Sequence, residues 1–338
     1  MNYQWLSSYP EGIAWDASWD MRPAYAILDE TVSKYGERPA FDFLGKCWTW
    51  QEIGEKVANL AGGLQKMGVE KGTKVGLFLP NTPYYLIAYY AILKAGGTVV
   101  NYNPLYVKRE LIHQIKDSQT KIMFTLDLAM LYDKMQAVRD KSGLEKLIIC
   151  PFTEILPFPK NILFKLFKGG ECANVKLSGD HGEDVYFDTL CEKASDFNAV
   201  SCDAEKDVAV LQYTGGTTGV PKGAMLSHAN VLSNVEQACL WFVNARAGQE
   251  KMLGVLPFFH VFAMTAVMNL SVRLGFEIVA LPRFDLEQAL KLIDKKKPHY
   301  MPAVPAIYNA INNYKDIGKY DLKSLRYFIS GGAPLPVE

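Results

Sequence analysis

Helical and strand-like patterns alternate along the first half of the chain. A Thr49-x-x-Glu52 capping box opens a run of apolar residues at helical spacing, and Gly68 ends it. Short apolar runs and further helical segments follow, with strands expected at 75–79, 98–100, 122–125 and 147–150, and helices through Tyr90 to a stop at Gly96, at 105–118 and at 128–142. This order predicts a largely parallel sheet covered by helices.

The same alternation resumes after residue 207. We expect strands at 208–212, 223–226, 252–256, 276–280 and 327–330, a helix capped by Ser227, and helices at 261–272, 286–296 and 304–314. The pattern predicts an α/β fold made of two packed subdomains with mostly parallel sheets. We place the boundary near residue 200, which gives subdomains at 1–200 and 201–338.

The segment 151–170 interrupts this rhythm inside the first subdomain. Prolines are followed by an apolar run, Phe158 to Phe167, that also contains Lys160, Lys165 and Lys168. Aromatic and aliphatic groups mixed with ammonium groups are typical of segments that lie on a membrane surface. The alternative is a surface hairpin folded onto its own subdomain, and the sequence leaves both open.

Composition narrows the class of protein. The 338 residues carry 36 Lys plus Arg and 36 Asp plus Glu, so no overall field favours nucleic acid as a partner. The six cysteines form no C-x-x-C pair and no metal-ligand spacing with the histidines, so we expect reduced thiols in a cytoplasmic protein and assign no metal ligand. No signal peptide is expected at the N-terminus, and no apolar run approaches the roughly 20 residues that span a bilayer.

The run from Tyr213 to Gly223 has the composition of a loop around a polyphosphate. Its glycines let backbone N–H groups approach anionic oxygens, threonine hydroxyls add neutral donors, and Lys222 brings a mobile positive charge. The spacing differs from G-x-x-x-x-G-K-[ST], because Val220 and Pro221 separate Gly219 from Lys222. A plain turn between strands needs fewer residues. We therefore expect ATP to bind to the second subdomain.

Four segments together resemble the signatures of a known family. Besides the glycine-threonine loop, they are 101–106 (Asn-Tyr-Asn-Pro-Leu-Tyr), 256–260 (Leu-Pro-Phe-Phe-His) and 331–335 (Gly-Gly-Ala-Pro-Leu). Their order and approximate spacing resemble those of the acyl-adenylate-forming, or AMP-binding, enzymes, and above all the bacterial long-chain fatty acid CoA ligases. The resemblance implies the N-terminal domain of an adenylate-forming enzyme.

The resemblance also implies roles for individual residues. Thr214, Thr217 and Lys222 would contact the β- and γ-phosphates of ATP, with the other nucleotide-binding residues being Tyr213, Gly215, Gly216, Thr218, Gly219, Gly331, Gly332, Ala333 and Pro334. His260 would stabilise charge between the acyl carboxylate and the α-phosphate. On the residues alone, His260 fits a hydrogen-bonded core position and Gly331 a strand-ending turn. Candidates for the acyl tunnel, which fit core positions equally well, are Val261, Phe262, Met264 and Val304.

The expected function is that of an ATP-dependent acyl-CoA synthetase. Its substrates would be a long-chain fatty acid, ATP with Mg²⁺, and coenzyme A, and a homodimer is compatible with the pattern. Related enzymes continue beyond a position equivalent to Glu338 with a magnesium-binding glutamate, a ribose-binding aspartate and an adenylation lysine, so we expect little ligase activity from these residues alone. Alternatives are another acyl- or aryl-CoA ligase, an amino-acid adenylation domain, a luciferase-like oxygenase, or a non-catalytic nucleotide-binding protein. We expect peripheral contact with the inner face of the membrane if the segment 151–170 lies on the membrane surface, and not if it is a surface hairpin.

Overall fold

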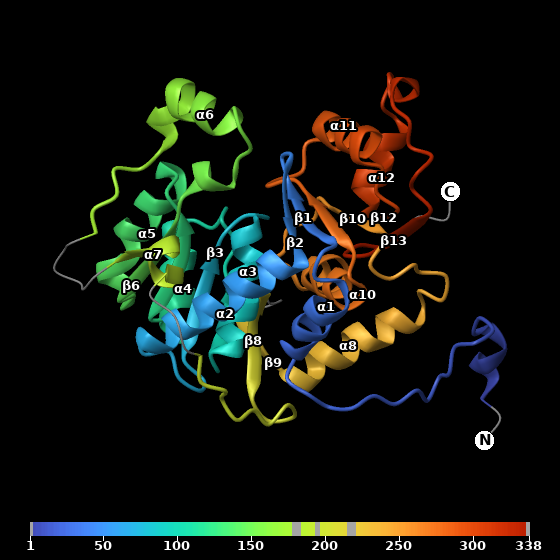
Figure 1. The fold of residues 1–338 in the computed structure, drawn as a ribbon, viewed down its shortest axis with the longest axis horizontal. Coiled ribbons are helices and arrows are strands. Elements are labelled where there is room, and N and C mark those ends of the chain that lie inside the picture. The colour runs from blue at the N-terminus through green and yellow to red at the C-terminus, as the bar shows by residue number, and fades with distance from the viewer. Residues whose placement is uncertain (1–2, 178–183, 193–196, 215–220, 336–338) are drawn as a thin grey trace.

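Two β-sheets covered by helices organise the chain (Figure 1). The computed structural model describes residues 3–177, 184–192, 197–214 and 221–335. In these ranges the first sheet has seven strands, in the spatial order β7 (Val185–Tyr186), β6 (Lys146–Cys150), β5 (Ile122–Leu126), β3 (Lys74–Phe78), β4 (Thr98–Asn101), β8 (Val208–Thr214) and β9 (Lys222–Ser227). All neighbouring strands in it are parallel except β8 and β9.

The second sheet has six strands within the described residues. Their spatial order is β13 (Tyr327–Ser330), β12 (Tyr300–Ala303), β10 (Lys251–Gly254), β11 (Glu277–Ala280), β1 (Pro39–Phe43) and β2 (Lys46–Thr49). Only β1 and β2 pair antiparallel. The predicted α/β class with mostly parallel sheets is therefore confirmed.

The helices begin and end close to the predicted residues. The Thr49–Glu52 capping box is formed, because Thr49 Oγ1 accepts from the Glu52 N–H and the Glu52 carboxylate accepts from the Thr49 N–H. The helices that flank the strands are α1 (Ala26–Tyr35), α2 (Trp50–Lys66), α3 (Pro83–Lys94), α4 (Lys108–Ser118), α5 (Ala129–Ser142), α7 (Phe187–Glu192), α8 (His228–Leu240), α11 (Leu286–Lys296) and α12 (Pro305–Asn312). The helix expected at 261–272 consists of α9 (Val261–Ala263), the π-helix η4 (Met264–Asn269) and α10 (Leu270–Leu274).

Among the strands, β1, β2, β7 and β12 were not predicted from the sequence. The hairpin of β1 and β2 turns at Leu44 and Gly45, whose φ angles are 54° and 103°, and leucine is an unusual residue for that conformation. The Asp42 side chain supports the turn by accepting from the Gly45 N–H. Because β1 and β2 join the second sheet while β8 and β9 join the first, the sheets do not divide near residue 200. A folding boundary at that point stays a prediction.

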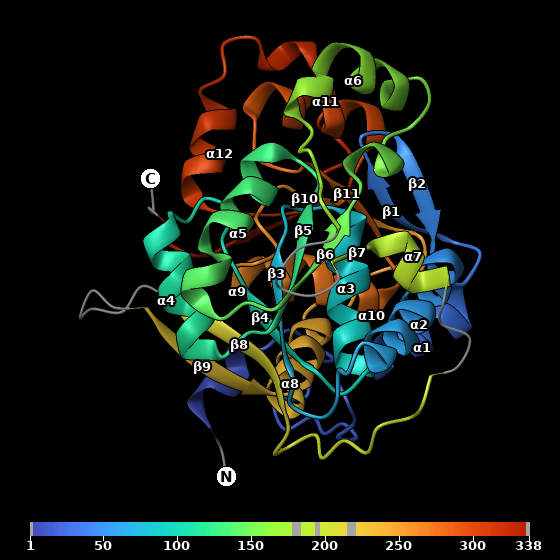
Figure 2. The same ribbon diagram turned by 90° about the vertical axis from the view of Figure 1, so that its left-hand side faces the viewer.

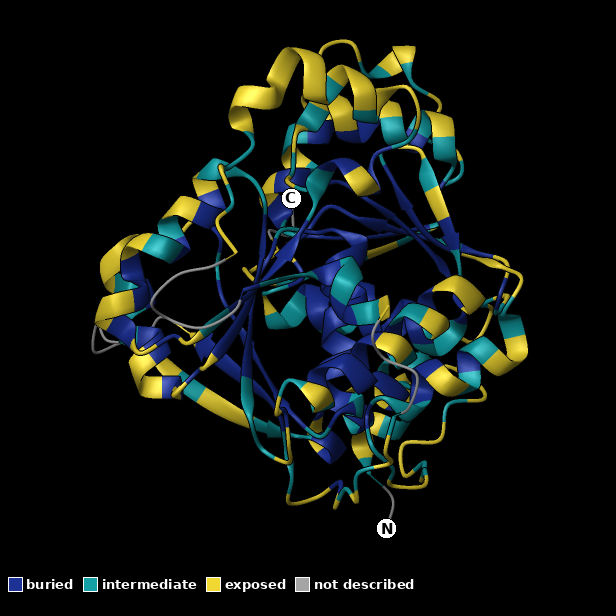
Figure 3. Cartoon of the chain, turned by 60° about the vertical axis from the view of Figure 1, so that its left-hand side comes forward, coloured by how far each residue is buried: buried dark blue, intermediate teal, exposed yellow. Residues whose placement is uncertain are grey.

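The core lies between the sheets, and α3 runs through it. Every residue of α3 from Pro83 to Leu93 is buried, which suits a helix that is apolar on all sides. Its Tyr90 hydroxyl donates to Asn269 Oδ1 at 2.8 Å, so α3 is joined to the π-helix of the second half. Figure 3 shows buried residues in the strands of both sheets and in the helices between them.

The buried amide side chain of Asn81, two residues before α3, bonds backbone groups in the second half of the chain. Asn81, which is 2% exposed, donates from Nδ2 to the Leu256 carbonyl at 2.7 Å and accepts at Oδ1 from the Phe258 N–H at 2.8 Å. A side-chain amide therefore gives an irregular backbone the partners that a neighbouring strand would supply. These two hydrogen bonds fix the backbone of residues 256–258, which follow β10.

A second set of buried polar side chains holds the same segment. The Tyr85 hydroxyl lies 2.6 Å from Asn101 Oδ1 and 3.1 Å from the Phe258 carbonyl oxygen. Asn101 Nδ2 donates to Gln212 Oε1 at 2.9 Å, and Gln212 Nε2 donates to the Phe259 carbonyl at 3.0 Å. Asn101 ends β4 and Gln212 lies in β8, so the carboxyl edge of the first sheet positions residues 256–260.

The helix α6 (Lys160–Lys168) stands apart from the sheets at the top of the molecule (Figures 1 and 2). It replaces the surface hairpin that was one expectation for 151–170, and none of its residues is buried. Within the described ranges, no helix combines the length and the apolar character that crossing a bilayer requires.

His228 joins the N-terminal segment to α8. It is 4% exposed, and its Nδ1 accepts from the Ala24 N–H at 3.1 Å. Burial lowers the pKa of His228 from 6.5 to about 4, although nearby Asp207 acts in the opposite direction. The imidazole of His228 is therefore neutral near pH 7.

We predict that replacing Asn81 by Ala lowers the free energy of unfolding by about 2–6 kcal/mol. The change leaves the Leu256 carbonyl and the Phe258 N–H buried without these partners, at about 1–3 kcal/mol each. Urea unfolding at neutral pH measures the effect. The control is Asn313→Ala, because the Asn313 amide bonds the Asn309 carbonyl at the surface and its loss should change stability by about 0.5 kcal/mol at most. Equal stabilities of the two variants would contradict this assignment.

His228 should make stability fall on acidification. Because its folded pKa lies below the unfolded value, the unfolded chain binds more protons as the pH decreases from 6.5 toward about 4. The associated loss is about 3 kcal/mol, from roughly 1.4 kcal/mol per pKa unit. His228→Asn keeps an acceptor near Nδ1 and does not titrate, so its unfolding free energy should depend less on pH in this interval. Parallel curves for the variant and the parent would refute the prediction.

Candidate active site

The segment at 256–260 places His260 beside the carboxyl edge of the first sheet. His260 precedes α9, and its Nδ1 accepts from the Phe262 N–H at 3.3 Å. The neutral ring that accepts at Nδ1 carries its proton on Nε2. The side chain is exposed and lines a cavity of about 180 Å³. His260 can thus offer an N–H to an anion in this cavity.

The other walls of this cavity come from the first sheet. Thr214 is the last residue of β8 and is exposed at the rim, and Gln212 lies deeper. The remaining lining comes from the 101–106 segment, from β8 and from the neighbours of His260: Asn101, Asn103, Tyr106, Tyr213, Phe259 and Val261. Residues of the 101–106 signature and the first residues of the glycine-threonine loop, Tyr213 and Thr214, therefore line the same cavity as His260. Their order in the sequence alone does not reveal this.

Lys222 lies opposite Thr214 across the antiparallel pair of β8 and β9. It is the first residue of β9, and its side chain is exposed. Among the described residues, no acidic group forms an ion pair with it. The glycine-threonine loop thus leaves the sheet at Thr214 and returns at Lys222. The predicted phosphate contacts of Gly215, Gly216, Thr217, Thr218 and Gly219 lie outside the described residues.

Tyr213 has a structural contact that was not anticipated. Its hydroxyl donates to Asp117 Oδ2 at 2.5 Å, and burial followed by this hydrogen bond raises the pKa of Tyr213. Its ring packs on Gly223, where a Cβ atom would come within 2.9 Å of ring carbons. The hydroxyl is therefore occupied by Asp117, and only the ring and the backbone of Tyr213 are left to face a nucleotide.

The turn after β13 lies beside Phe262 and Val304. The Gly331 N–H donates to the Ala303 carbonyl at 3.3 Å, and a Cβ at Gly331 would come within 2.8 Å of the Phe262 ring. Gly332 has a φ of 76°, and a Cβ there would lie 3.3 Å from Val304 Cγ1. Only a residue without a side chain lets the backbone lie this close to the ring. Ala333 and Pro334 are exposed.

The predicted acyl-tunnel residues do not all lie together. Val261 lines the cavity of His260, whereas Phe262 and Val304 contact the turn at Gly331 and Gly332. Met264 is 1% exposed, and its sulfur lies 3.5 Å from Asn101 Nδ2 in the core. Met264 therefore supports the wall of the cavity from behind.

Sequence reasoning gave no role to the polar residues behind His260. Asn81, Tyr85, Asn101 and Gln212 are buried and fix the backbone of 256–260. The available signal was an amide inside an otherwise apolar strand, as at Gln212 between Leu211 and Tyr213. Such an amide must find a partner when it is buried, but the sequence does not say which.

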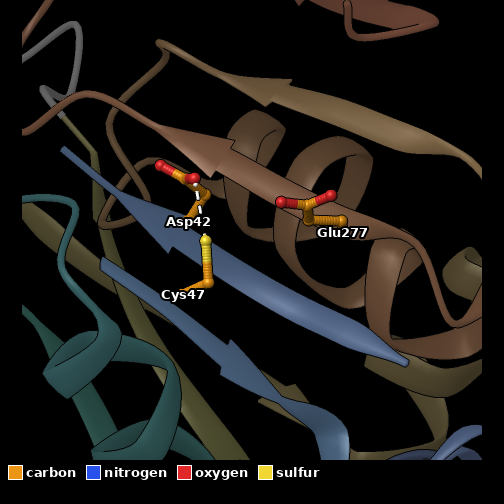
Figure 4. A group of neighbouring side chains, drawn as sticks. All are labelled: Asp42, Cys47 and Glu277. Carbon is orange, nitrogen blue, oxygen red and sulfur yellow. Dashed lines mark hydrogen bonds between the residues drawn. The ribbon is translucent and has the colours of Figure 1, made fainter. Parts of the chain in front are cut away.

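A group of potential metal ligands lies elsewhere, at the edge of the second sheet. Figure 4 shows Asp42, Cys47 and Glu277, whose ligand atoms lie within 4.8 Å of one another. Lys296 pairs with Asp42, and Lys251 pairs with Glu277 at 3.0 Å, so both carboxylates are already neutralised. Burial and the Asp42 hydrogen bond raise the pKa of Cys47 to about 12. We therefore assign this group to packing of the hairpin.

Known proteins with similar sequences and structures give this geometry a context. A family model described as AMP-binding enzyme matches residues 28–338. A long-chain-fatty-acid–CoA ligase of Bacillus subtilis is 40% identical over 337 residues, covering 99% of this chain and 59% of that protein. One of Escherichia coli O157:H7 is 32% identical, with 99% and 60% covered. This chain thus spans about 60% of the length of these relatives.

Solved structures of this family have the same fold. A long-chain-fatty-acid-CoA ligase from Archaeoglobus fulgidus matches with a TM-score of 0.78 and 28% identity, over 97% of this chain and 61% of that one. The N-terminal domain of FACL13 from Mycobacterium tuberculosis matches with a TM-score of 0.76 and 24% identity, over 94% and 71%. The chain belongs to the family of AMP-binding enzymes and has the fold of the N-terminal domain of adenylate-forming acyl-CoA ligases.

Proposed function

We propose that this chain binds the nucleotide and the acyl group in an ATP-dependent ligase that converts a long-chain fatty acid to its CoA thioester. The observation that carries the proposal is the meeting of His260, Thr214 and the Asn-Pro-Leu-Tyr segment around one cavity, with Lys222 opposite Thr214. The substrate class is proposed from the relatives in Bacillus subtilis and Escherichia coli, which are named as long-chain-fatty-acid–CoA ligases.

The first step of the proposed reaction joins two anions. A carboxylate oxygen attacks the α-phosphorus of ATP, a new O–P bond forms, and the bond to pyrophosphate breaks. The carboxylate is already ionised, so no protein base is needed. The protein must hold the reactants in line and stabilise negative charge on the phosphoryl oxygens.

The side chains of the cavity suit these tasks. The Nε2–H of His260 would donate to the acyl carboxylate and the α-phosphate, while Thr214 and Lys222 would hold the β- and γ-phosphates. Mg²⁺, when bound to ATP, would neutralise part of the phosphate charge. Gly331 to Pro334 would take the adenine, because the glycine backbone leaves a flat surface. Val261 and Phe262 are the proposed contacts of the acyl chain.

The second step of the proposed reaction releases the product. The thiol of coenzyme A loses its proton, its sulfur attacks the acyl carbon, and AMP leaves with the electrons of the broken C–O bond. ATP–pyrophosphate exchange with palmitate, acetate, 4-coumarate and amino acids, on the protein as it occurs in the cell, tests the substrate class. Exchange that depends on palmitate supports the proposal, and exchange that depends only on another acid rejects a fatty acid substrate.

We predict that Lys222→Ala weakens binding of magnesium-ATP by at least about tenfold, which is about 1.4 kcal/mol. The reason is the loss of a mobile positive charge beside the triphosphate. Isothermal titration calorimetry measures the affinity directly. Lys206→Ala serves as the control, because Lys206 is an exposed lysine that pairs with Asp203 outside this cavity. Equal affinities of the parent and the Lys222 variant would remove Lys222 from the site.

Two substitutions at His260 separate catalysis from helix capping. His260→Asn keeps an oxygen that can accept from the Phe262 N–H, whereas His260→Ala removes that acceptor as well. Both lack Nε2, so both should lower the rate of ATP–pyrophosphate exchange by about 10²-fold or more, in line with the loss of one preorganised donor. If His260→Asn kept the parent rate, the role of His260 would be limited to capping α9.

A further inference from the structure

The helix α6 presents its apolar side chains to solvent. Ile162 and Leu166 are four residues apart, as are Leu163 and Phe167, so these pairs are neighbours along one face. Leu166 is 72% exposed, Phe167 is 81% exposed, and the preceding Phe158 is 79% exposed. An amphipathic helix of a globular protein ordinarily turns such a face toward the core.

One aromatic residue holds α6 in this orientation. Phe164 is partly buried, and its ring lies 5.1 Å from that of Phe152 in an edge-to-face contact. Leu166 lies about 160° around the helix axis from Phe164, so the docking of Phe164 turns Leu166 toward solvent. Phe167 lies nearer to Phe164 around the axis but is itself 81% exposed. Figures 1 and 2 both place α6 at the outer end of the molecule, away from the strands of the first sheet.

Three lysines border this face. Lys160 Nζ donates to the Leu44 carbonyl at 2.7 Å, Lys165 lies 3.9 Å from Glu154, and Lys168 lies 3.0 Å from Glu171. The two ion pairs are exposed on both sides, so each contributes little and can be exchanged for lipid phosphates. With three lysines against two glutamates, the excess of positive charge is small. The apolar side chains must therefore supply most of any affinity.

We propose that α6 is a membrane-surface anchor that inserts Phe158, Leu166 and Phe167 into an anionic bilayer. With nine residues, α6 is about 14 Å long, so it lies in the plane of the interface and does not cross it. A projecting helix can enter a lipid surface, which has no fixed shape, whereas a protein partner would have to provide a matching groove. The bordering lysines complement lipid phosphates.

This proposal does not rest on the ligase reaction. If the protein is a fatty acid ligase, the anchor would hold it at the surface in which its substrate dissolves. If the proposed reaction is wrong, α6 would still bind lipid. Vesicle binding without substrates therefore tests the anchor alone.

Vesicle flotation with a matched pair of double variants is the experiment. The anchor variant is Leu166→Ser/Phe167→Ser. The control variant is Met130→Ser/Met225→Ser, because Met130 and Met225 are 66% and 71% exposed on other elements. Two kinds of vesicle are compared: phosphatidylcholine alone, and phosphatidylcholine with roughly 30 mole percent phosphatidylglycerol. Binding to the neutral vesicles reports apolar insertion, and the additional binding to the anionic vesicles reports electrostatic attraction. Circular dichroism checks that both variants are folded.

The parent and the control variant should float with the anionic vesicles, and more weakly with neutral ones. The anchor variant should bind at least about tenfold more weakly to both. Lys165→Gln/Lys168→Gln should lose about fivefold or more, and only on the anionic vesicles.

Two results would overturn the proposal. The first is equal flotation of the parent and the anchor variant, and the second is no flotation of the parent on either vesicle. If, in the second case, gel filtration showed a dimer of the parent that Leu166→Ser/Phe167→Ser dissociates, the exposed face would belong to a contact between two copies of the chain.

Discussion

The geometry of the candidate site depends on buried amides that must be hydrogen-bonded. Asn81 and Gln212 are 2% and 6% exposed, so each amide group left unpaired would cost about 1–3 kcal/mol. Their partners are backbone groups of Leu256, Phe258 and Phe259. The path of this irregular segment, and with it the position of His260, is therefore set by the carboxyl edge of the first sheet and by the start of α3.

The same constraint brings residues of both sheets close to the His260 segment. β8 carries Gln212 and, two residues later, Thr214 at the rim of the cavity. The second sheet contributes the turn at Gly331, which meets Phe262 immediately after His260. Thr214, at the end of a strand of the first sheet, thus lines one cavity with His260 and Val261, and the turn that follows a strand of the second sheet lies against Phe262. Parallel α/β sheets commonly place binding groups at the carboxyl ends of their strands.

Much of this could be predicted from local patterns, and the rest could not for a physical reason. The Thr49–Glu52 box and the helix at 286–296 depend on residues a few positions apart, so the sequence contained the whole signal. Asn101 and Gln212 bond each other across 111 positions of the sequence, and a burial requirement does not name its partner. Tyr213 was predicted to bind the nucleotide, but nothing in the sequence indicated that its hydroxyl bonds Asp117, which is 96 positions away. The apolar pattern of α6 was visible, but the contact of Phe164 with Phe152 decides which way it faces.

His260, Thr214 and the turn at Gly331 are proposed to hold one acyl adenylate between them. A crystal structure of the protein with a non-hydrolysable acyl-sulfamoyl adenosine tests this most directly. We expect the sulfamoyl group within hydrogen-bond distance of His260 Nε2, the adenine against the backbone of Gly331 to Ala333, and the acyl chain beside Phe262. An analogue bound away from His260, with the cavity between β8 and α9 empty, would contradict it.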